Sequence, residues 1–579
     1  MARTFATVID EAGVNADWKL LRETLASSLS AVDVPFKTPA IDDALSQPFS
    51  PEMVFTARDV LPALFRRSSA TCQRESACPV ASREGSAVEA LLARMKAIDA
   101  SLARAFAELP PDVDTAALQD ALPALLERTS TGTDLSDHPL GTTLLAAAQA
   151  IDRRALHQTA AILRNLVSPA QLEALRAALI QRSPIPTPEA LHKHVSGPLL
   201  AARQTPIGWL IIGGADDNVY RGPAALIIDL GGNDQYEVPA PARTHAVIDL
   251  AGDDHYRADE PGGLAGGILS ASLVVDVAGD DHYRAQLVGQ GAAVLGIGVL
   301  VDHEGHDRYR AGTLAQGAAL FGIGMIEDSA GDDHYRAAKY AQGFGGPGGS
   351  GMLRDSAGDD QYHAGGVYPS SYGIDGHYQA FSQGVGMGSR GSAAGGVGVL
   401  EDLAGDDVYH GGNFTQGVGY YLGVGLLADA TGADRYRGGR YSQGAGAHLG
   451  AGMLHEGAGN DSYTGRTAAN QGAAWDLAVG KLLDCGGDDD HYAADLSLGA
   501  AAQHAVGALF DTEGVDTYIT GAHALGVSGK RDYGDGRDGA GNLGVFLDAG
   551  GTIDGYPVDG HGKDDSTILR GQHGLFIDQ

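Results

Sequence analysis

The pattern of apolar and polar positions changes near residue 206. Before that point, apolar residues recur at three- and four-residue spacing, as in AVEALLARMKAIDASLARAFAEL (87–109) and LEALRAALI (172–180). This is the spacing of amphipathic helices, and prolines such as Pro139 and Pro169 separate the segments. The pattern predicts an α-helical domain over residues 1–205.

After residue 206 the pattern is that of short strands. Apolar runs such as SLVVDV (272–277) and GIGVLV (296–301) alternate with glycine turns, and no segment keeps a helical period. Only five of the 84 glycines precede residue 206. The composition therefore places a domain boundary there and predicts a glycine- and aspartate-rich β domain over residues 206–579.

This second domain repeats a motif, D-x-x-G-x-D-x-Y, followed by Gln-Gly and then G-x-G-x-L. Most of the repeated tyrosines are 26 or 27 residues apart. They are Tyr236, Tyr256, Tyr283, Tyr309, Tyr335, Tyr362, Tyr409, Tyr436, Tyr463, Tyr492, Tyr518 and Tyr556. A fixed period of this length indicates stacked units that share one core. The sequence predicts a mainly β protein, a parallel β-helix with one coil per repeat. A β-propeller is the main rival, but its blades need about 40 residues.

In a β-helix, equivalent residues of successive coils stack about 4.8 Å apart. The two acids of the motif then form two columns. The first contains Asp229, Asp249, Asp276, Asp302, Asp328, Asp355, Asp402, Asp429, Glu456, Asp484, Asp511 and Asp548. The second contains Asp234, Asp254, Asp281, Asp307, Asp333, Asp360, Asp407, Asp434, Asp461 and Asp516, with Asp490 and Asp554 after one-residue insertions.

Carboxylates at this spacing repel one another by roughly 1 kcal/mol in water and about 3–4 kcal/mol at an effective dielectric constant near 20. Calcium, which takes six to eight oxygen ligands in flexible geometry, is one way to offset this repulsion. The alternative is that each aspartate caps its own turn by accepting backbone N–H bonds, which requires no metal.

The segment EGAGNDSYTG (456–465), with DLGGNDQY (229–236), DLAGDDHY (249–256) and DSAGDDQY (355–362), resembles the calcium loop of repeats-in-toxin (RTX) proteins, G-G-x-G-x-D-x-U-x. The resemblance implies that the second aspartates bind calcium between coils and that the tyrosines point inward. The implied ligands are Asp234, Asp254, Asp281, Asp333, Asp360, Asp407 and Asp461. The pattern departs from that family because these loops recur every 26 or 27 residues rather than every nine, and an acid replaces the first glycine.

Basic residues flank the tyrosines. His255, His282, Arg308, His334 and Arg435 precede them, and Arg257, Arg284, Arg310, Arg336 and Arg437 follow them. If the tyrosines point inward, both flanks point outward. The resulting basic stripe either neutralises the acidic turns or binds an anionic polymer such as a polyuronate. A further column of glutamines is predicted to form an amide ladder between coils; it contains Gln290, Gln316, Gln342, Gln383, Gln416, Gln443 and Gln471.

The regular spacing of the repeats is interrupted between Tyr362 and Tyr409. Most of the extra length is HAGGVYPSSYGIDGHYQAF (363–381). A loop that leaves a regular solenoid is a common place for function. Asp375, His377 and Tyr378 in this loop are candidate acid–base groups for glycan cleavage, and an inert surface insertion is the alternative.

The charge balance of the chain limits the classes of partner that it is expected to bind. The 73 acidic residues outnumber the 40 Lys and Arg residues, for a net charge of −33. Such a chain repels nucleic acid and anionic membranes and attracts cations. The apolar run at 291–301 is too short for the ~20 residues of a membrane span, and no signal peptide is visible. Cys72 and Cys78 are close enough for a small disulfide loop, while Cys485 stands alone.

These features favour a calcium-stabilised extracellular or envelope scaffold that binds glycan, located outside the cell or in the periplasm. The alternative is a β-helix polysaccharide lyase, epimerase or hydrolase that acts on an anionic glycan. β-Helices host both kinds of function, so the fold does not decide between them.

Overall fold

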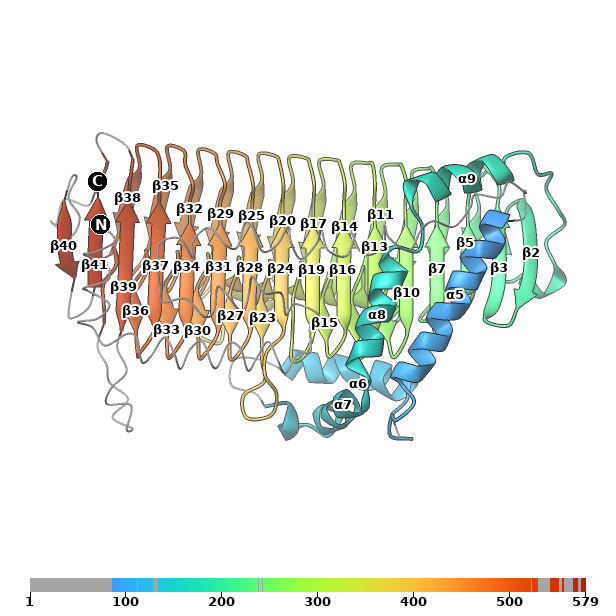
Figure 1. Cartoon of the computed structure of the whole chain (residues 1–579), viewed down its shortest axis with the longest axis horizontal. Helices are drawn as coiled ribbons and strands as arrows, with labels where there is room; N and C mark the ends of the chain where they lie inside the picture. Colours follow the sequence, from blue (N-terminus) through green and yellow to red (C-terminus); the bar gives the residue numbers. More distant parts are fainter. Residues whose placement is uncertain are drawn as a thin grey trace.

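In the computed structural model, the chain forms a long parallel β-solenoid with helices along one side (Figure 1). The structure describes residues 86–111, 113–128, 134–237, 239–241, 243–521, 523–529, 542–550, 554–556, 566–570 and 574–578. Cys72, Cys78 and the rest of the first 85 residues of the predicted helical domain lie outside the described residues. The predicted fold class, a parallel β-helix with an α-helical N-terminal region, is confirmed.

The described helices lie between residues 86 and 191. They are α5 (Ser86–Ala105), α6 (Thr115–Arg128), α7 (Pro139–Ala150), α8 (Arg153–Arg164) and α9 (Pro169–Leu179), with short 3₁₀ turns at Leu135–Asp137 and Glu189–Leu191. Local signals fix their starts: Asp152 caps α8 by accepting from the Ala155 N–H at 3.0 Å, and Ser168 and Gln171 form a capping box at α9. None of the described helices is long and apolar enough to cross a bilayer.

Sheet A is the 16-stranded sheet. In spatial order it contains β2 (Leu199–Thr205), β3 (Gly208–Gly213), β5 (Leu226–Ile228), β7 (Thr244–Ile248), β10 (Ala271–Val275), β13 (Ile297–Val301), β16 (Ile323–Glu327), β19 (Ser350–Arg354), β24 (Val397–Glu401), β28 (Val424–Ala428), β31 (Ala451–His455), β34 (Val479–Leu483), β37 (Val506–Asp511), β39 (Leu543–Asp548), β41 (Gly574–Asp578) and β40 (Thr567–Arg570). Only the outermost pairs, β2 with β3 and β40 with β41, are antiparallel.

Sheet B carries the repeated tyrosines. It contains β1 (Val195–Ser196), β4 (Val219–Tyr220), β6 (Gln235–Glu237), β8 (His255–Ala258), β11 (His282–Gly289), β14 (Arg308–Ala315), β17 (His334–Ala337), β20 (Gln361–Ala364), β25 (Val408–Gly411), β29 (Arg435–Gly438), β32 (Ser462–Gly465), β35 (Asp490–Ala493) and β38 (Thr517–Thr520), with β18 (Lys339–Ala341) paired to β14.

Two-residue strands form the third face, sheet C, in two groups. The groups are β9 (Gly267–Ile268), β12 (Ala293–Val294) and β15 (Ala319–Leu320), and then β23 (Gly386–Met387), β27 (Gly419–Tyr420), β30 (Gly446–Ala447), β33 (Ala474–Trp475) and β36 (Ala501–Ala502). A regular coil therefore runs from sheet A through the acidic turn to sheet B, then through the Gln-Gly turn to sheet C, and on to the next strand of sheet A.

The strands keep strict register from coil to coil. Tyr283 pairs with Tyr256 on one side and with Tyr309 on the other, and their rings stack at 4.7 Å on both sides. The tyrosines point inward because flanking residues alternate with them, giving an exposed–buried–exposed–buried pattern along β8. The sequence prediction that the tyrosines are core residues is therefore correct along most of the column.

One repeat was aligned wrongly. His491, not Tyr492, pairs with Tyr463 and stacks on it at 4.6 Å, whereas Tyr492 is 52% exposed. Likewise Asp489, not Asp490, occupies the second acidic column, and the side chain of Asp490 is exposed. The segment CGGDDDHY offers three consecutive aspartates, and the backbone register, which the tyrosine spacing alone did not show, selects the middle one.

The glutamines do not form a side-chain ladder. The Gln316 amide donates to the Tyr309 carbonyl at 2.9 Å in its own coil and to the Arg336 carbonyl at 3.2 Å in the next coil. Gln342 and Gln416 repeat this arrangement. Each buried amide therefore links two coils through backbone carbonyls. The glutamine itself occupies a turn position with positive φ, 54° at Gln316.

The helices pack along the side of the solenoid rather than forming a separate body. Helix α8 packs on β10 and β13, α5 packs on β7, and their buried leucines join those of sheet A in one core cluster. A polar contact reinforces this docking, since Arg243 pairs with Asp99 at 2.6 Å; separately, the buried Lys339 of β18 in sheet B donates to the Leu126 carbonyl of α6 at 2.7 Å. The helices thus cover part of the outer face of sheet A near the first coils (Figure 1).

The motif glycine is required by the close stacking of turns. A Cβ atom on Gly331, whose φ is +154°, would lie 1.5 Å from the Gly305 carbonyl oxygen. We expect Gly331→Ala to lower the free energy of unfolding by about 3 kcal/mol through this clash and backbone strain. Thermal unfolding of the full chain would measure the loss.

Gly366→Ala is the matched control. Gly366 also has positive φ, +84°, but nothing lies within 4 Å of its added Cβ, so only the strain of about 1 kcal/mol should appear. Equal losses for the two variants would contradict the role of turn stacking.

Candidate functional site

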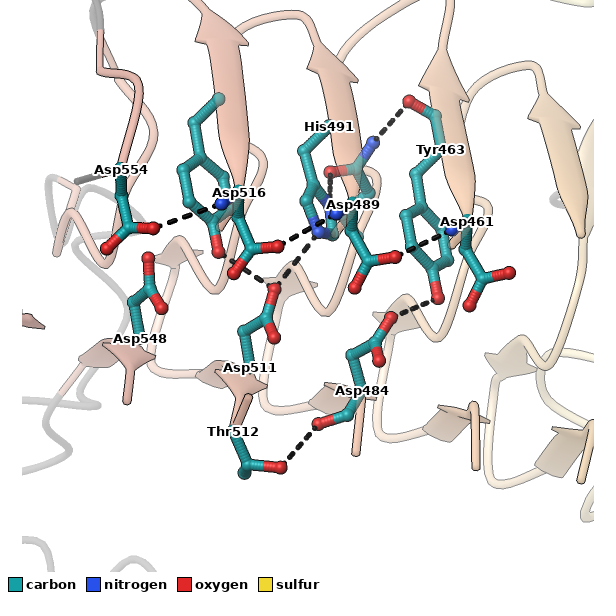
Figure 2. A network of polar contacts seen from close by, with 12 residues as sticks. Asp461, Tyr463, Asp484, Asp489, His491, Asp511, Thr512, Asp516, Asp548 and Asp554 are labelled. Atoms are coloured by element: carbon teal, nitrogen blue, oxygen red, sulfur yellow. Dashed lines mark hydrogen bonds and ion pairs between the residues drawn. The ribbon is translucent and has the colours of Figure 1, made fainter. Parts of the chain in front are cut away.

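The most unusual feature of the solenoid is its acidic interior. The first acid of each repeat ends or directly follows a strand of sheet A, and the second lies two residues before the column tyrosine or, in one coil, before His491. From Asp229 to Asp548 every member of the two columns is at most 2% exposed. Figure 2 shows the C-terminal part of the columns, with Asp484, Asp511 and Asp548 in one, and Asp461, Asp489, Asp516 and Asp554 in the other.

Two hydrogen bonds hold most acids of the first column, whereas Oδ1 of Asp302, Asp429 and Asp511 has no hydrogen-bond partner in the described structure. In Asp276, Oδ1 accepts from the Ala278 N–H at 3.1 Å, and Oδ2 accepts from the Tyr256 hydroxyl of the preceding coil at 2.5 Å. The same tyrosine bond recurs at 2.5–2.7 Å along the column. The first acid therefore caps its own turn, as one of the two sequence interpretations proposed, and also ties that turn to the neighbouring coil.

Each acid of the second column uses one carboxylate oxygen, Oδ1, to accept a hydrogen bond from the backbone of the preceding coil. Asp333 Oδ1 accepts from the Asp307 N–H at 2.6 Å, and Asp307 Oδ1 accepts from the Asp281 N–H at the same distance. The other oxygen, Oδ2, is buried and has no hydrogen-bond partner in nine residues. These residues are Asp254, Asp307, Asp333, Asp360, Asp407, Asp434, Asp461, Asp489 and Asp516. Turn capping alone leaves these nine oxygens unexplained.

The two columns approach each other closely. Carboxylate oxygens of Asp276, Asp281 and Asp302 lie within 4.8 Å of one another, and equivalent groups recur in the other coils. Four of these groups combine the first acids of two adjacent coils with one second acid, and a further group combines Asp484 and Asp489 with His491. The all-oxygen donor set of the first four suits a hard divalent cation.

No Lys or Arg ion pair neutralises the columns between Asp229 and Asp548 in the described structure. The only side chain within ion-pair distance is His491, 3.4 Å from Asp511, and burial lowers the pKa of His491 to about 4, so it is neutral at pH 7. Burial, together with neighbouring carboxylates, raises the pKa of Asp254 to about 7 and that of Asp333 to about 10. The interior thus favours bound protons or bound cations over bare carboxylates.

Sequence reasoning missed a third, exposed acidic row, formed in several coils by an aspartate just before the second acid and interrupted by residues such as His306 and Ala433. The Asp280 N–H donates to Asp253 Oδ1 at 3.1 Å, and the Asp359 N–H donates to Asp332 Oδ1 at 3.0 Å. The doubled aspartate of the motif was the available signal. Since these side chains are exposed, the row makes the turn edge of the solenoid negative.

The predicted basic stripe forms the outer face of sheet B. Arg284, Arg310 and Arg336 are exposed and consecutive in register on β11, β14 and β17. In the described structure none of the three makes an ion pair, so the stripe does not neutralise the acidic turns by direct contact. Burial first, then nearby positive charge, lowers the pKa of His410 to about 4, so the arginines supply most of the charge of this face at pH 7.

The insertion forms a small separate sheet of β21 (Tyr368–Pro369), β22 (Tyr378–Ser382) and β26 (Asn413–Thr415). Asp375 is exposed, whereas His377 and Tyr378 are half-buried. No hydrogen bond or ion pair joins these three side chains in the described structure; His377 contributes its backbone carbonyl to the Ser370 N–H at 2.9 Å. The loop therefore does not assemble them into a catalytic group.

The tyrosine–acid bond gives a direct stability test. Tyr463 donates to Asp484 Oδ2 at 2.5 Å (Figure 2), so Tyr463→Phe removes the only donor to a buried oxygen. We expect a loss of about 1–3 kcal/mol in the free energy of unfolding, measured by thermal unfolding. Tyr492→Phe is the control, since its side chain is exposed, and should change stability little; a loss there equal to that at Tyr463 would contradict the assigned register.

The raised pKa values predict an unusual pH dependence for the metal-stripped protein. Unfolded aspartate has a pKa near 3.9, whereas the pKa in the folded state is about 7 for Asp254, about 8 for Asp307 and about 11 for Asp360. The folded state keeps protons that the unfolded chain has released, so stability should fall as the pH rises through this window.

Thermal unfolding in the presence of a chelator should therefore give a higher midpoint at about pH 5 than at about pH 9. A midpoint that rises with pH across this range would show that the columns do not hold protons in the folded state.

Comparison of the chain with protein-family models, with curated proteins and with solved structures finds no match.

Proposed function

We propose that this protein is a non-catalytic β-solenoid scaffold that binds calcium in its acidic interior and glycan on its outer face. The observation that carries the proposal is the column of buried Oδ2 atoms without hydrogen-bond partners. An unsatisfied buried acceptor costs about 1–3 kcal/mol, and more when it is charged. Nine of them in one column call for a ligand that supplies positive charge.

Calcium suits this interior in charge and in chemistry. Each regular coil contributes two buried carboxylates, so one divalent ion per coil balances them. Three carboxylate oxygens converge within 4.8 Å in groups such as Asp276, Asp281 and Asp302, and calcium accepts carboxylate, hydroxyl and carbonyl oxygens in irregular geometry. The second aspartates would hold the ion through Oδ2, because Oδ1 is already bonded to the backbone.

The resemblance to RTX loops supports the same assignment, since there too the aspartate before the inward-facing residue binds calcium. Calcium in the millimolar range is typical of sites in extracellular modules. We therefore place the scaffold outside the cell or in the envelope, where its long exposed sheets would contact surface glycans.

The enzyme alternative has less support. Acid–base catalysis needs groups within hydrogen-bonding reach of one reacting atom. Asp375 points to solvent while His377 and Tyr378 are half-buried, and no contact joins them. The geometry of this loop gives no reason to prefer a lyase or hydrolase to a binding scaffold.

Two adjacent aspartates of one turn provide the test. Asp333 is buried with an unpartnered Oδ2, and Asp332 beside it is 61% exposed. If calcium occupies the columns, Asp333→Asn should remove about one ion per chain and reduce the stabilisation by calcium. Asp332→Asn, the matched control, should leave both unchanged. Metal analysis of untreated protein and thermal unfolding with and without calcium measure these effects.

The same variant distinguishes protons from metal. An asparagine at 333 can still accept from the Asp307 N–H and resembles a protonated carboxyl group. If protons alone balance the columns, Asp333→Asn should keep full stability at neutral pH, and the untreated protein should contain no bound metal. That pair of results would refute the calcium assignment.

A further inference from the structure

We infer that the glycan partner is a linear anionic polysaccharide that lies along the solenoid axis, across the outer face of sheet B. This inference rests on the proposed glycan binding but not on calcium. It begins from the residues that the strict register of sheet B places outward, on either side of the buried tyrosines.

Two rows of basic residues run parallel to the axis on this face. The row after the tyrosines contains four consecutive arginines on β8 to β17, Arg257, Arg284, Arg310 and Arg336, then His363 and His410, then Arg437 on β29. Burial lowers the pKa of both histidines, so the arginines supply the positive charge of this row at pH 7. The row before the tyrosines contains His255, His282, Arg308, His334 and Arg435, interrupted by Gln361 and Val408. The face thus offers up to two basic groups per strand.

The spacing of the rows suits a polymer with one charge per sugar. Adjacent strands are about 4.8 Å apart, which is close to the length of one 1,4-linked pyranose unit. The four consecutive arginine strands span three such steps, about 14 Å, and would face about four sugar residues; Arg437 lies three strands further along, so a polymer of about seven sugars, about 29 Å, would reach it as well. Because the arginines share one register, a straight chain of carboxylates meets them one after another.

The arginines are available for a ligand. Arg284, Arg310 and Arg336 are exposed and make no ion pair within the described structure, whereas Arg257 pairs with Asp259 at 2.8 Å. In a chain of net charge −33, exposed unpaired arginines in sequence form a local positive field. Guanidinium groups bind carboxylates in bidentate geometry, so this field selects for planar acids.

Neighbouring features favour a polysaccharide over nucleic acid. The exposed acidic row of Asp253, Asp280, Asp332, Asp359 and Asp406 borders the basic rows and repels a densely charged polymer; double-stranded DNA carries one charge per ~1.7 Å. No Phe, Tyr or Trp lies among the outward positions of β8 to β29, so bases would have no aromatic platform. A more sparsely charged sugar acid avoids both problems.

The test uses the full chain and galacturonate oligomers of about seven and about three sugars, with lengths chosen to match or fall short of the seven strands. Their methyl-esterified counterparts serve as neutral ligands. Titration calorimetry at low ionic strength and without added calcium measures Kd, because polyuronates also bind calcium. We expect the long acid to bind at least about tenfold more tightly than the short one, and the neutral oligomers not to bind.

The test variant replaces three of the four consecutive arginines, Arg284→Gln, Arg310→Gln and Arg336→Gln, and should weaken binding about tenfold or more. The matched control makes the same change in charge at exposed arginines on the helical side, Arg104→Gln, Arg154→Gln and Arg182→Gln. It should leave Kd unchanged. Thermal unfolding of both variants checks that folding is intact.

The outcomes separate this inference from the proposed function. Equal binding of neutral and acidic oligomers would keep a glycan scaffold but overturn recognition of charge on sheet B. Equal weakening by both triple variants would show non-specific attraction and overturn the site. Tighter binding of single-stranded DNA than of the acid would make nucleic acid the partner, and the absence of binding to any ligand would remove the glycan function itself, whatever the calcium content.

Discussion

Each regular coil of this solenoid depends on a hydrogen bond between a buried tyrosine hydroxyl and the carboxylate that opens the following turn. Tyr309 donates to Asp328, Tyr335 to Asp355 and Tyr409 to Asp429, always one coil onward. The bond couples the two parts of the repeat that are least alike, the apolar stack and the acidic turn. The tyrosine rings of adjacent coils stack with their centroids 4.6–5.0 Å apart, and this stacking sets the rise from one coil to the next.

The same arrangement creates an electrostatic constraint. Stacking the turns in register buries two carboxylates in each coil, and no Lys or Arg reaches them between Asp229 and Asp548 in the described structure. In most coils, backbone N–H groups and tyrosine hydroxyls satisfy three of the four oxygens; the coils of Asp302, Asp429 and Asp511 are exceptions, because Oδ1 of these residues also lacks a partner. The fourth, Oδ2 of the second acid, is repeatedly without a partner. A fold that repeats an orphaned acceptor so regularly has either a proton or a cation at each position, and this choice sets how stability responds to pH and to metal.

The inner and outer faces of sheet B differ in chemistry because successive residues of a strand point to opposite faces. The inward positions place tyrosines over acids, while the outward positions place Arg and His residues in rows. The period of the repeat therefore produces two chemically distinct surfaces from one motif. Of the N-terminal helices, α5 and α8 pack on sheet A, on strands β7, β10 and β13, whereas α6 contacts β18, the short strand that continues sheet B beyond β17, through Lys339.

The sequence by itself determined the architecture, the inward tyrosines, the two acidic columns and the outward basic rows, because a period of 26 or 27 residues and the strand alternation are both visible in one dimension. It could not determine the register where a repeat was irregular, so His491 and Asp489 were missed in favour of Tyr492 and Asp490. Only the tertiary structure decided that the columns are fully buried, that Gln316 bonds to backbone carbonyls rather than to another amide, and that the insertion leaves Asp375 apart from His377. These properties depend on which atoms of neighbouring coils meet, and stacking, not sequence spacing, decides that.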